Sequence, residues 1–182
     1  MDYSNEKFEF TGETKTTPSG IIVHRIRAVV TFGCVSAGEI GGWIETPDNL
    51  SMAGNAWVEG DARVEGDARV AGNARVAGDA WVAGNACVTG NALVADDAWV
   101  TGNARVAGNA DYVVFKNCWS SYRWFTYTRS NRMWRVGCFL GTGEELIKKA
   151  YNDSETSGRC YEAIVRAMEQ IEEAMRHKGG AQ

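Results

Sequence analysis

The residues best suited to binding chemistry are concentrated between positions 116 and 135. Aromatic planes beside guanidinium groups can hold a nucleobase and a phosphate together, because the ring stacks while the cation pairs with the anion. Strand alternation divides such residues between two faces, so we expect part of this set to be plain core. The ligand-binding candidates are Lys116, Trp119, Arg123, Trp124, Tyr127, Arg129, Arg132, Trp134 and Arg135.

Residues for catalysis are sparse in this chain. The two histidines are His24 and His177, and a general base of near-neutral pKa is what acid–base chemistry requires. Cys34 could be paired with His24 as nucleophile and base, but no acid that would orient the histidine is apparent. The five cysteines lack CxxC spacing. We therefore expect no catalytic residue, no metal and no cofactor.

Composition and charge indicate which partners and which cellular compartment to expect for this chain. A net charge of −4 makes bulk attraction to nucleic acid unexpected. No apolar run approaches membrane-spanning length and no signal-peptide core is present, so we expect no membrane association. An odd number of cysteines without disulfide spacing fits free thiols in a reducing cytosol. These features together predict a cytoplasmic protein.

The largest element before the binding candidates is a run of ten hexads from position 52 to 111. Each hexad reads large aliphatic, variable, Gly, Asn or Asp, Ala, variable. Gly, Asn and Asp tolerate left-handed backbone, so each hexad is read as a short strand followed by a corner. The single lapse is Asp96, which replaces Gly at a corner. A short fixed period indicates stacked repeats that bury their apolar faces against one another.

The hexads resemble those of hexapeptide-repeat proteins, and this resemblance implies three hexads per triangular coil. Residues 18 positions apart would then lie on the same face of a prism. The position after each Ala points outward and carries Trp or Arg in most hexads. Repeated flat faces suit a closed homotrimer, with a ligand-stacking surface as the alternative. The candidates for an oligomer or partner interface are Trp57, Arg63, Arg75, Trp81, Trp99 and Arg105.

The six-residue spacing continues toward the N-terminus from Met52 and defines the predicted domain boundaries. Steps of six from Met52 reach Thr46 and Ile40, so residues 40–111 form about four coils. Residues 1–39 are interpreted as an N-terminal β cap, and residues 112–182 as a C-terminal α+β domain. The predicted fold class is mainly β, and the resemblance to hexapeptide-repeat proteins implies a left-handed parallel β-helix as its centre.

The C-terminal domain is predicted to be a three-stranded meander followed by two helices. The strand candidates are residues 112–116, 123–128 and 133–139. Thr142 and Glu145 fit a capping box that opens the first helix. A break at residues 152–158 separates it from a second helix at 159–177, which carries an apolar stripe. Gly141 and Gly143 could form a phosphate loop, but the Lys-Ser/Thr of that motif is missing.

The segments 22–28 (IVHRIRA) and 37–45 (AGEIGGWIE), with the hexads, resemble a family of phage and prophage hexapeptide-repeat proteins over residues 20–111. The resemblance implies a left-handed parallel β-helix. Members of that family are often labelled as acyltransferase-like on the repeat alone. Hexapeptide acyltransferases use a His base and loops that protrude over acyl-CoA. Between Met52 and Asp111 this chain has no insertion and no His.

The resemblance and the missing catalytic groups lead to one functional hypothesis and its alternatives. We expect a non-catalytic phage or prophage protein that acts in the host cytoplasm and sequesters a nucleotide-like immune signalling molecule. The first alternative is a protein-binding inhibitor of a host defence complex or a structural trimerisation module. The second is a hexapeptide-type acyltransferase that depends on His24.

Overall fold

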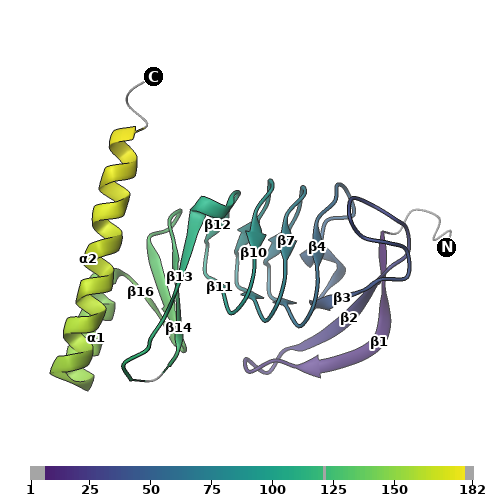
Figure 1. Cartoon of the computed structure of the whole chain (residues 1–182). Coiled ribbons are helices and arrows are strands. Elements are labelled where there is room, and N and C mark those ends of the chain that lie inside the picture. The colour runs from purple at the N-terminus through teal and green to yellow at the C-terminus, as the bar shows by residue number, and fades with distance from the viewer. Residues whose placement is uncertain (1–6, 121, 179–182) are drawn as a thin grey trace.

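The computed structural model describes residues 7–120 and 122–178. Three parts follow one another along the molecule: an N-terminal hairpin, a β-solenoid of about four turns, and an antiparallel sheet covered by two helices (Figure 1). The solenoid confirms the mainly β prediction for the repeat. In the part of the chain that is described, no helix has the length and apolar character to cross a membrane.

The hexads form two-residue strands that stack in parallel from coil to coil. Two faces carry three of them each, in the orders β4-β7-β10 and β6-β9-β12, and the third face continues as β5-β8-β11. Trp81 pairs with Trp99 and Arg69 pairs with Cys87, so the predicted grouping of residues 18 apart is confirmed. The strands are β4 (Trp57–Val58), β5 (Arg63–Val64), β6 (Arg69–Val70), β7 (Arg75–Val76), β8 (Trp81–Val82), β9 (Cys87–Val88), β10 (Leu93–Val94), β11 (Trp99–Val100) and β12 (Arg105–Val106).

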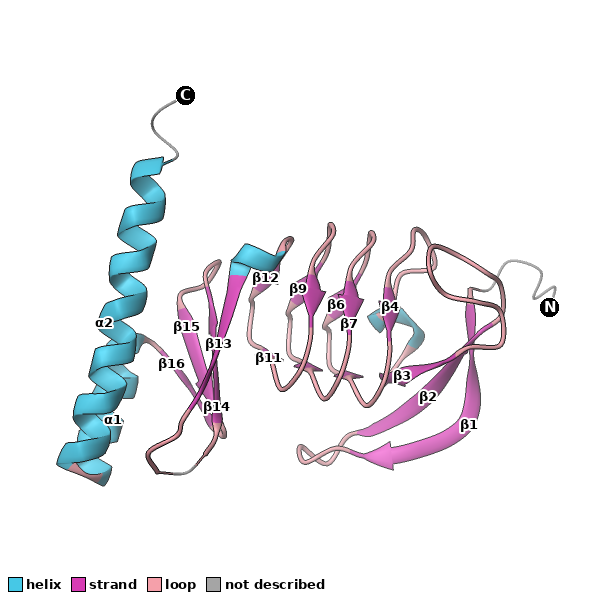
Figure 2. Cartoon of the chain, viewed as in Figure 1, coloured by secondary structure: helices cyan, strands magenta, loops and turns pink. Residues whose placement is uncertain are grey.

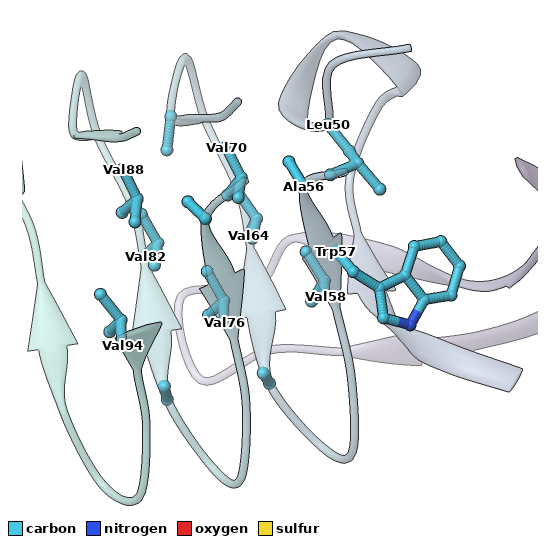
Figure 3. Close-up of a cluster of buried hydrophobic side chains, with 14 of the residues drawn as sticks. Leu50, Ala56, Trp57, Val58, Val64, Val70, Val76, Val82, Val88 and Val94 are labelled. Atoms are coloured by element: carbon cyan, nitrogen blue, oxygen red, sulfur yellow. The ribbon is translucent and has the colours of Figure 1, made fainter. Parts of the chain in front are cut away.

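The interior of the solenoid is a column of valine and alanine. At every sixth position, the valines from Val58 to Val106 and the alanines from Ala56 to Ala104 are buried. The valine side chains labelled in Figure 3 point into the shared interior. Burial of a Val side chain stabilises a fold by about 1.5–3 kcal/mol. The corners turn on glycines with φ between 61° and 75°, and Asp96 adopts the same left-handed backbone at φ 58°.

The first coil is two residues longer than the others. Strand β3 (Ile40–Ile44) pairs Ile44 with Val64, and Leu50 bridges Val70, both twenty positions apart. Trp57 pairs with Arg75, eighteen positions apart, so the two extra residues lie between Leu50 and Trp57, after the short 3-10 turn η1 (Pro47–Asn49). Ile44 and Leu50 therefore take the buried valine positions. The prediction that Ile40 and Met52 point inward is wrong: both are exposed, Met52 to 44 %.

An antiparallel hairpin covers the N-terminal end of the solenoid. Strands β1 (Phe8–Thr16) and β2 (Ile22–Ala28) pair with each other, and β2 continues the sheet of β3 (Figure 1). This cap and the first coil enclose the Trp57 ring, which meets the Phe32 ring edge-on at 5.5 Å. Trp57 has no exposed surface. The expectation that Trp57 lies on an open face is therefore wrong.

The C-terminal sheet has four strands rather than three. Its order is β13 (Tyr112–Lys116), β14 (Trp124–Thr128), β15 (Met133–Val136) and β16 (Phe139–Gly141), all antiparallel. The predicted third strand does not continue through Gly137, which adopts φ 55° and turns the chain back on itself. Val136 then faces Phe139 across a tight hairpin.

Two helices pack on the far side of this sheet (Figure 2). Helix α1 (Gly143–Asp153) is capped by Thr142, whose hydroxyl accepts a hydrogen bond from the Glu145 N–H, as the capping box predicts. Helix α2 (Glu155–Lys178) begins directly after Ser154. The predicted break over residues 152–158 is too long, because Gly158 lies inside α2. A Cβ on Gly158 would meet the Tyr151 ring at 2.2 Å, so this glycine permits close helix packing.

Candidate functional site

The candidate site lies where the C-terminal sheet meets the two helices. Alternation along β14 turns Phe125 and Tyr127 toward the helices and Thr126 toward the solenoid, as the sequence predicts. Tyr127 pairs with Trp134 on β15, and the two rings lie 4.9 Å apart. These two rings form the sheet side of a pocket.

The helices supply the other side of the pocket. Val165 and Met168 of α2 are buried against the sheet. The first residue of α1, Gly143, approaches Val165 so closely that a Cβ on it would lie 2.5 Å from the Val165 Cγ1 atom. Helix α1 thus delivers its N-terminus to the edge of the pocket.

The pocket has a volume of about 280 Å³, at the small end of the range for ligand sites. Its floor is apolar and its rim is charged, an arrangement that suits a flat apolar group carrying an anion or a cation. The lining residues are Tyr127, Arg132, Trp134, Thr142, Gly143, Glu144, Val165, Met168, Glu169, Glu172 and Arg176.

Most of the charge on the rim is neutralised within the chain. The Arg129 Nε donates to the Glu172 carboxylate at 2.6 Å, and this bond raises the pKa of Arg129. Arg166 donates to both Glu144 and Glu169, at 2.6 and 3.0 Å. All three carboxylates of the rim are therefore paired with guanidinium groups. Burial first, and then the Glu172 charge, raise the pKa of Tyr127.

Two arginines of the rim keep their charge available. Among residues 7–120 and 122–178, neither Arg132 nor Arg176 has an ion-pair partner. Arg132 also adopts φ 53°, in the left-handed region where L side chains are strained. Glycine would suit that backbone better, and backbone strain is concentrated at functional sites. The free charge of the rim is thus positive.

Of the nine ligand-binding candidates, the structure brings three together at the pocket. These are Tyr127, Arg132 and Trp134, and Arg129 stands behind the rim through its bond to Glu172. Trp119 is half-buried in the second core, with its ring 5.7 Å from the Tyr161 ring.

The remaining four candidates lie away from the pocket. Lys116 lies over the Trp124 ring at 5.1 Å. Arg135 faces the solenoid and stacks on the Trp99 ring, also at 5.1 Å. Arg123 lies against Gly137. The aromatic and basic residues therefore serve several contacts rather than one site.

Helical residues complete the pocket, and the search for binding residues in the sequence missed them. Val165 and Met168 belong to the predicted apolar stripe of the last helix, and Thr142 was predicted only as a cap. Glu169, Glu172 and Arg176 flank that stripe. The only sequence pattern that could have identified these pocket residues is a row of charged side chains beside the apolar stripe of an amphipathic helix. That pattern is too common to indicate a binding site.

The interface candidates on the third face of the solenoid are packed within the chain itself. The Trp81 ring is 7 % exposed and meets the Trp99 ring at 4.8 Å in an edge-on contact. Arg63 neighbours Trp81 on β5, and Arg135 covers Trp99 from the C-terminal sheet. Elsewhere, Arg75 pairs with Glu59 and Arg105 is exposed on β12. The tryptophans therefore do not form the open apolar patch that the sequence predicts.

Comparison with known proteins adds no relative whose activity could guide the interpretation of this site. No protein-family model matches the chain, and no curated protein matches its sequence.

Proposed function

We propose that this protein binds a small anionic molecule that carries a flat ring, and that it does so without catalysis. The observation that supports this most is the pocket beneath α2, with an apolar floor and two unpaired arginines on its rim. A ring-sized group fits about 280 Å³, while phosphate-like charge would lie at the rim. A nucleotide-like signalling molecule belongs to this class.

The biological setting belongs to the same proposal. The resemblance of residues 20–111 to phage and prophage hexapeptide-repeat proteins supports a role in which the chain sequesters a host immune signal. It also supports a left-handed winding of the solenoid, since one large and one small inward residue per hexad is that family's pattern. An experimental map at side-chain resolution would reveal the winding directly, and a right-handed trace would remove this part of the proposal.

Titration calorimetry against cyclic and ADP-ribose-type nucleotides tests the ligand class. We expect at least one member of the panel to bind. No heat with any member would end the nucleotide proposal and favour the protein-binding alternative, which predicts one dominant partner in a pull-down from host lysate.

The substitution Arg132→Gly separates binding from folding. A charge-assisted hydrogen bond contributes about 1.5–3 kcal/mol, so its loss should weaken binding by about tenfold or more. Glycine accepts the left-handed backbone at φ 53°, so unfolding in urea should occur at an equal or higher concentration.

The matched control for Arg132→Gly is Arg123→Ala, which removes an exposed arginine of the same sheet outside the pocket. This variant should bind like the parent protein. Equal losses in both variants would indicate general electrostatic attraction rather than the pocket.

A further inference from the structure

We infer that the Trp134 indole and the N-terminus of α1 form an oxyanion subsite inside the pocket, suited to a phosphate monoester. The inference rests on the proposed function, because it concerns the anionic end of the same ligand. It uses the backbone at Gly143, one of the two glycines considered as a phosphate loop in the sequence, and adds the indole N–H, which no sequence motif marks.

The first observation is a buried indole without a hydrogen-bond partner. Trp134 is 2 % exposed, and its ring is held between the Phe115 ring at 6.2 Å and the Tyr127 ring at 4.9 Å. Its Nε1 donates to no acceptor in the described part of the chain. The Trp134 Nε1 atom itself is not among the fully buried polar atoms that lack a partner, so it keeps accessible surface where Trp134 lines the pocket and is open to an acceptor that enters there.

The second observation is the backbone that faces this indole. A Cβ built on Gly143 would lie 3.4 Å from the Trp134 Nε1 atom and 2.5 Å from Val165 Cγ1. No side chain fits between them, so the backbone of Gly143 comes close to the indole nitrogen. Both residues line the pocket, which places the indole N–H and the start of α1 at one place in it.

The hydrogen bonds of the α1 cap leave two backbone donors open. Thr142 Oγ1 accepts from the Glu145 N–H, and the Thr142 carbonyl accepts from the Leu146 N–H. Within the described ranges, the N–H groups of Gly143 and Glu144 have no acceptor. Open N–H groups at a helix N-terminus favour anions through direct hydrogen bonds and the helix dipole.

The donors around this point suit an oxyanion, although the carboxylates beside them outnumber the one guanidinium, Arg166, that pairs with Glu144 and Glu169. Glu144 is bound by Arg166, and the Glu145 carboxylate accepts from the Thr142 N–H and hydroxyl. Arg132 and Arg176 stand on the same rim without carboxylate partners in the described chain. One indole donor, two backbone donors and nearby guanidinium groups match the several oxygens of a phosphate monoester.

The test follows the indole N–H cross-peak of Trp134 by NMR in the full-length protein. Trp134→Phe identifies that cross-peak among those of the seven tryptophans. AMP, adenosine and inorganic phosphate are then titrated separately. We expect the Trp134 cross-peak to shift with AMP and with phosphate, and to shift little with adenosine. Trp134→Phe should weaken AMP binding by about tenfold more than it weakens adenosine binding, because only AMP loses the hydrogen bond to the indole N–H.

The matched control is Trp119→Phe, because Trp119 packs in the same core, has a buried indole nitrogen without a partner in the described chain and does not line the pocket. Its AMP affinity should equal that of the parent protein. If AMP and adenosine bind equally and the Trp134 cross-peak stays in place, the subsite is wrong while the ring pocket stands. If phosphate shifts the cross-peak but no nucleotide binds, the subsite stands and the nucleotide proposal falls. If none of AMP, adenosine and phosphate binds or shifts the Trp134 cross-peak, both the oxyanion subsite and the proposed function are wrong.

Discussion

Single residues at the corners determine how well each coil closes. Most corners use glycine, but Asp96 has φ 58° and its backbone packs against Gly78, so an L side chain bears the left-handed conformation there. Glycine removes that strain, although it also gives the unfolded chain more freedom.

We predict that Asp96→Gly raises the free energy of unfolding by about 0.5–1 kcal/mol, measured by urea denaturation. Asp97→Gly is the control, because Asp97 is not among the left-handed residues and glycine there only adds unfolded-state freedom. If Asp96→Gly proves less stable than the parent, the side chain of Asp96 has a stabilising role that outweighs its backbone strain.

A buried amine at the N-terminal cap makes stability depend on pH. Lys7 is 4 % exposed, and its Nζ donates to the Ser51 carbonyl at 2.9 Å beneath the Phe32 ring. Desolvation lowers the pKa of Lys7 from 10.5 to about 8. Between these values the unfolded chain holds the proton and the folded chain does not, so stability rises as pH increases through this window.

The prediction is made relative to Lys7→Met, which removes the titrating amine and keeps an unbranched side chain. Other groups titrate at alkaline pH in both proteins and cancel in the comparison. From about pH 7 to about pH 10, the parent should gain unfolding free energy relative to the variant. If the difference in unfolding free energy between the two proteins is constant across that pH range, burial does not lower the pKa of Lys7.

At the scale of elements, side chains of the last hexad and of the C-terminal domain end the solenoid at its C-terminal side. In inner coils the N–H after each Ala donates to the carbonyl of the next coil, as in the bond from Arg75 to Ala92. The last coil has no such neighbour. Its three N–H groups, on Leu93, Trp99 and Arg105, donate to side-chain oxygens of Asn109, Thr126 and Ser130, at 2.7 to 2.8 Å.

We predict that Thr126→Val costs about 1–3 kcal/mol of unfolding free energy, because it keeps the shape of a buried residue and leaves the Trp99 N–H unpaired. Ser130→Ala is the comparison, since its bond to the Arg105 N–H is exposed to water, which can replace the hydroxyl. Urea denaturation of the two variants measures the difference. Equal costs would show that burial of the Trp99 N–H is not what makes this cap important.

The elements also show where sequence patterns succeed and where they stop. The hexad spacing predicts strand positions and faces because each coil repeats one local geometry. The first coil departs from it because two extra residues lie between Leu50 and Trp57, and periodicity cannot reveal an insertion of two residues. Gly137 was read as part of a strand, although a glycine inside an alternating run is also a turn signal.

The whole molecule explains why the site could be predicted only in part. Tyr127, Arg132 and Trp134 were identified by type, and their joining at one pocket depends on how α2 lies across the sheet. Long-range packing of this kind has no local signal. Arg135 lies on the other face of the sheet and stacks on Trp99, and the N-terminal cap encloses Trp57. Arginines and tryptophans that the sequence grouped together therefore have different surroundings.

The packing of Trp81 leads to a prediction about the molecule as a whole. Its ring is covered by neighbours within the chain, so Trp81→Ala should lower the free energy of unfolding by about 3 kcal/mol and leave the mass by light scattering unchanged. Leu93→Ala, at an exposed position of another face, is the control and should be nearly neutral. Loss of a trimer on Trp81→Ala would instead support the interface hypothesis; the homotrimer itself stays a prediction.

The closed ends of the solenoid have a consequence for molecular length. Both caps are built from residues outside the inner coils, and the inner coils are interchangeable in their core residues. Deleting residues 73–90 would join Gly72 to Asn91 and restore a Gly-Asn corner in register. The hairpin and the C-terminal pocket would then move closer by one strand spacing, about 4.8 Å. The solenoid is therefore a spacer whose length changes in steps of one coil, and the number of coils determines the distance between the N-terminal hairpin and the C-terminal pocket.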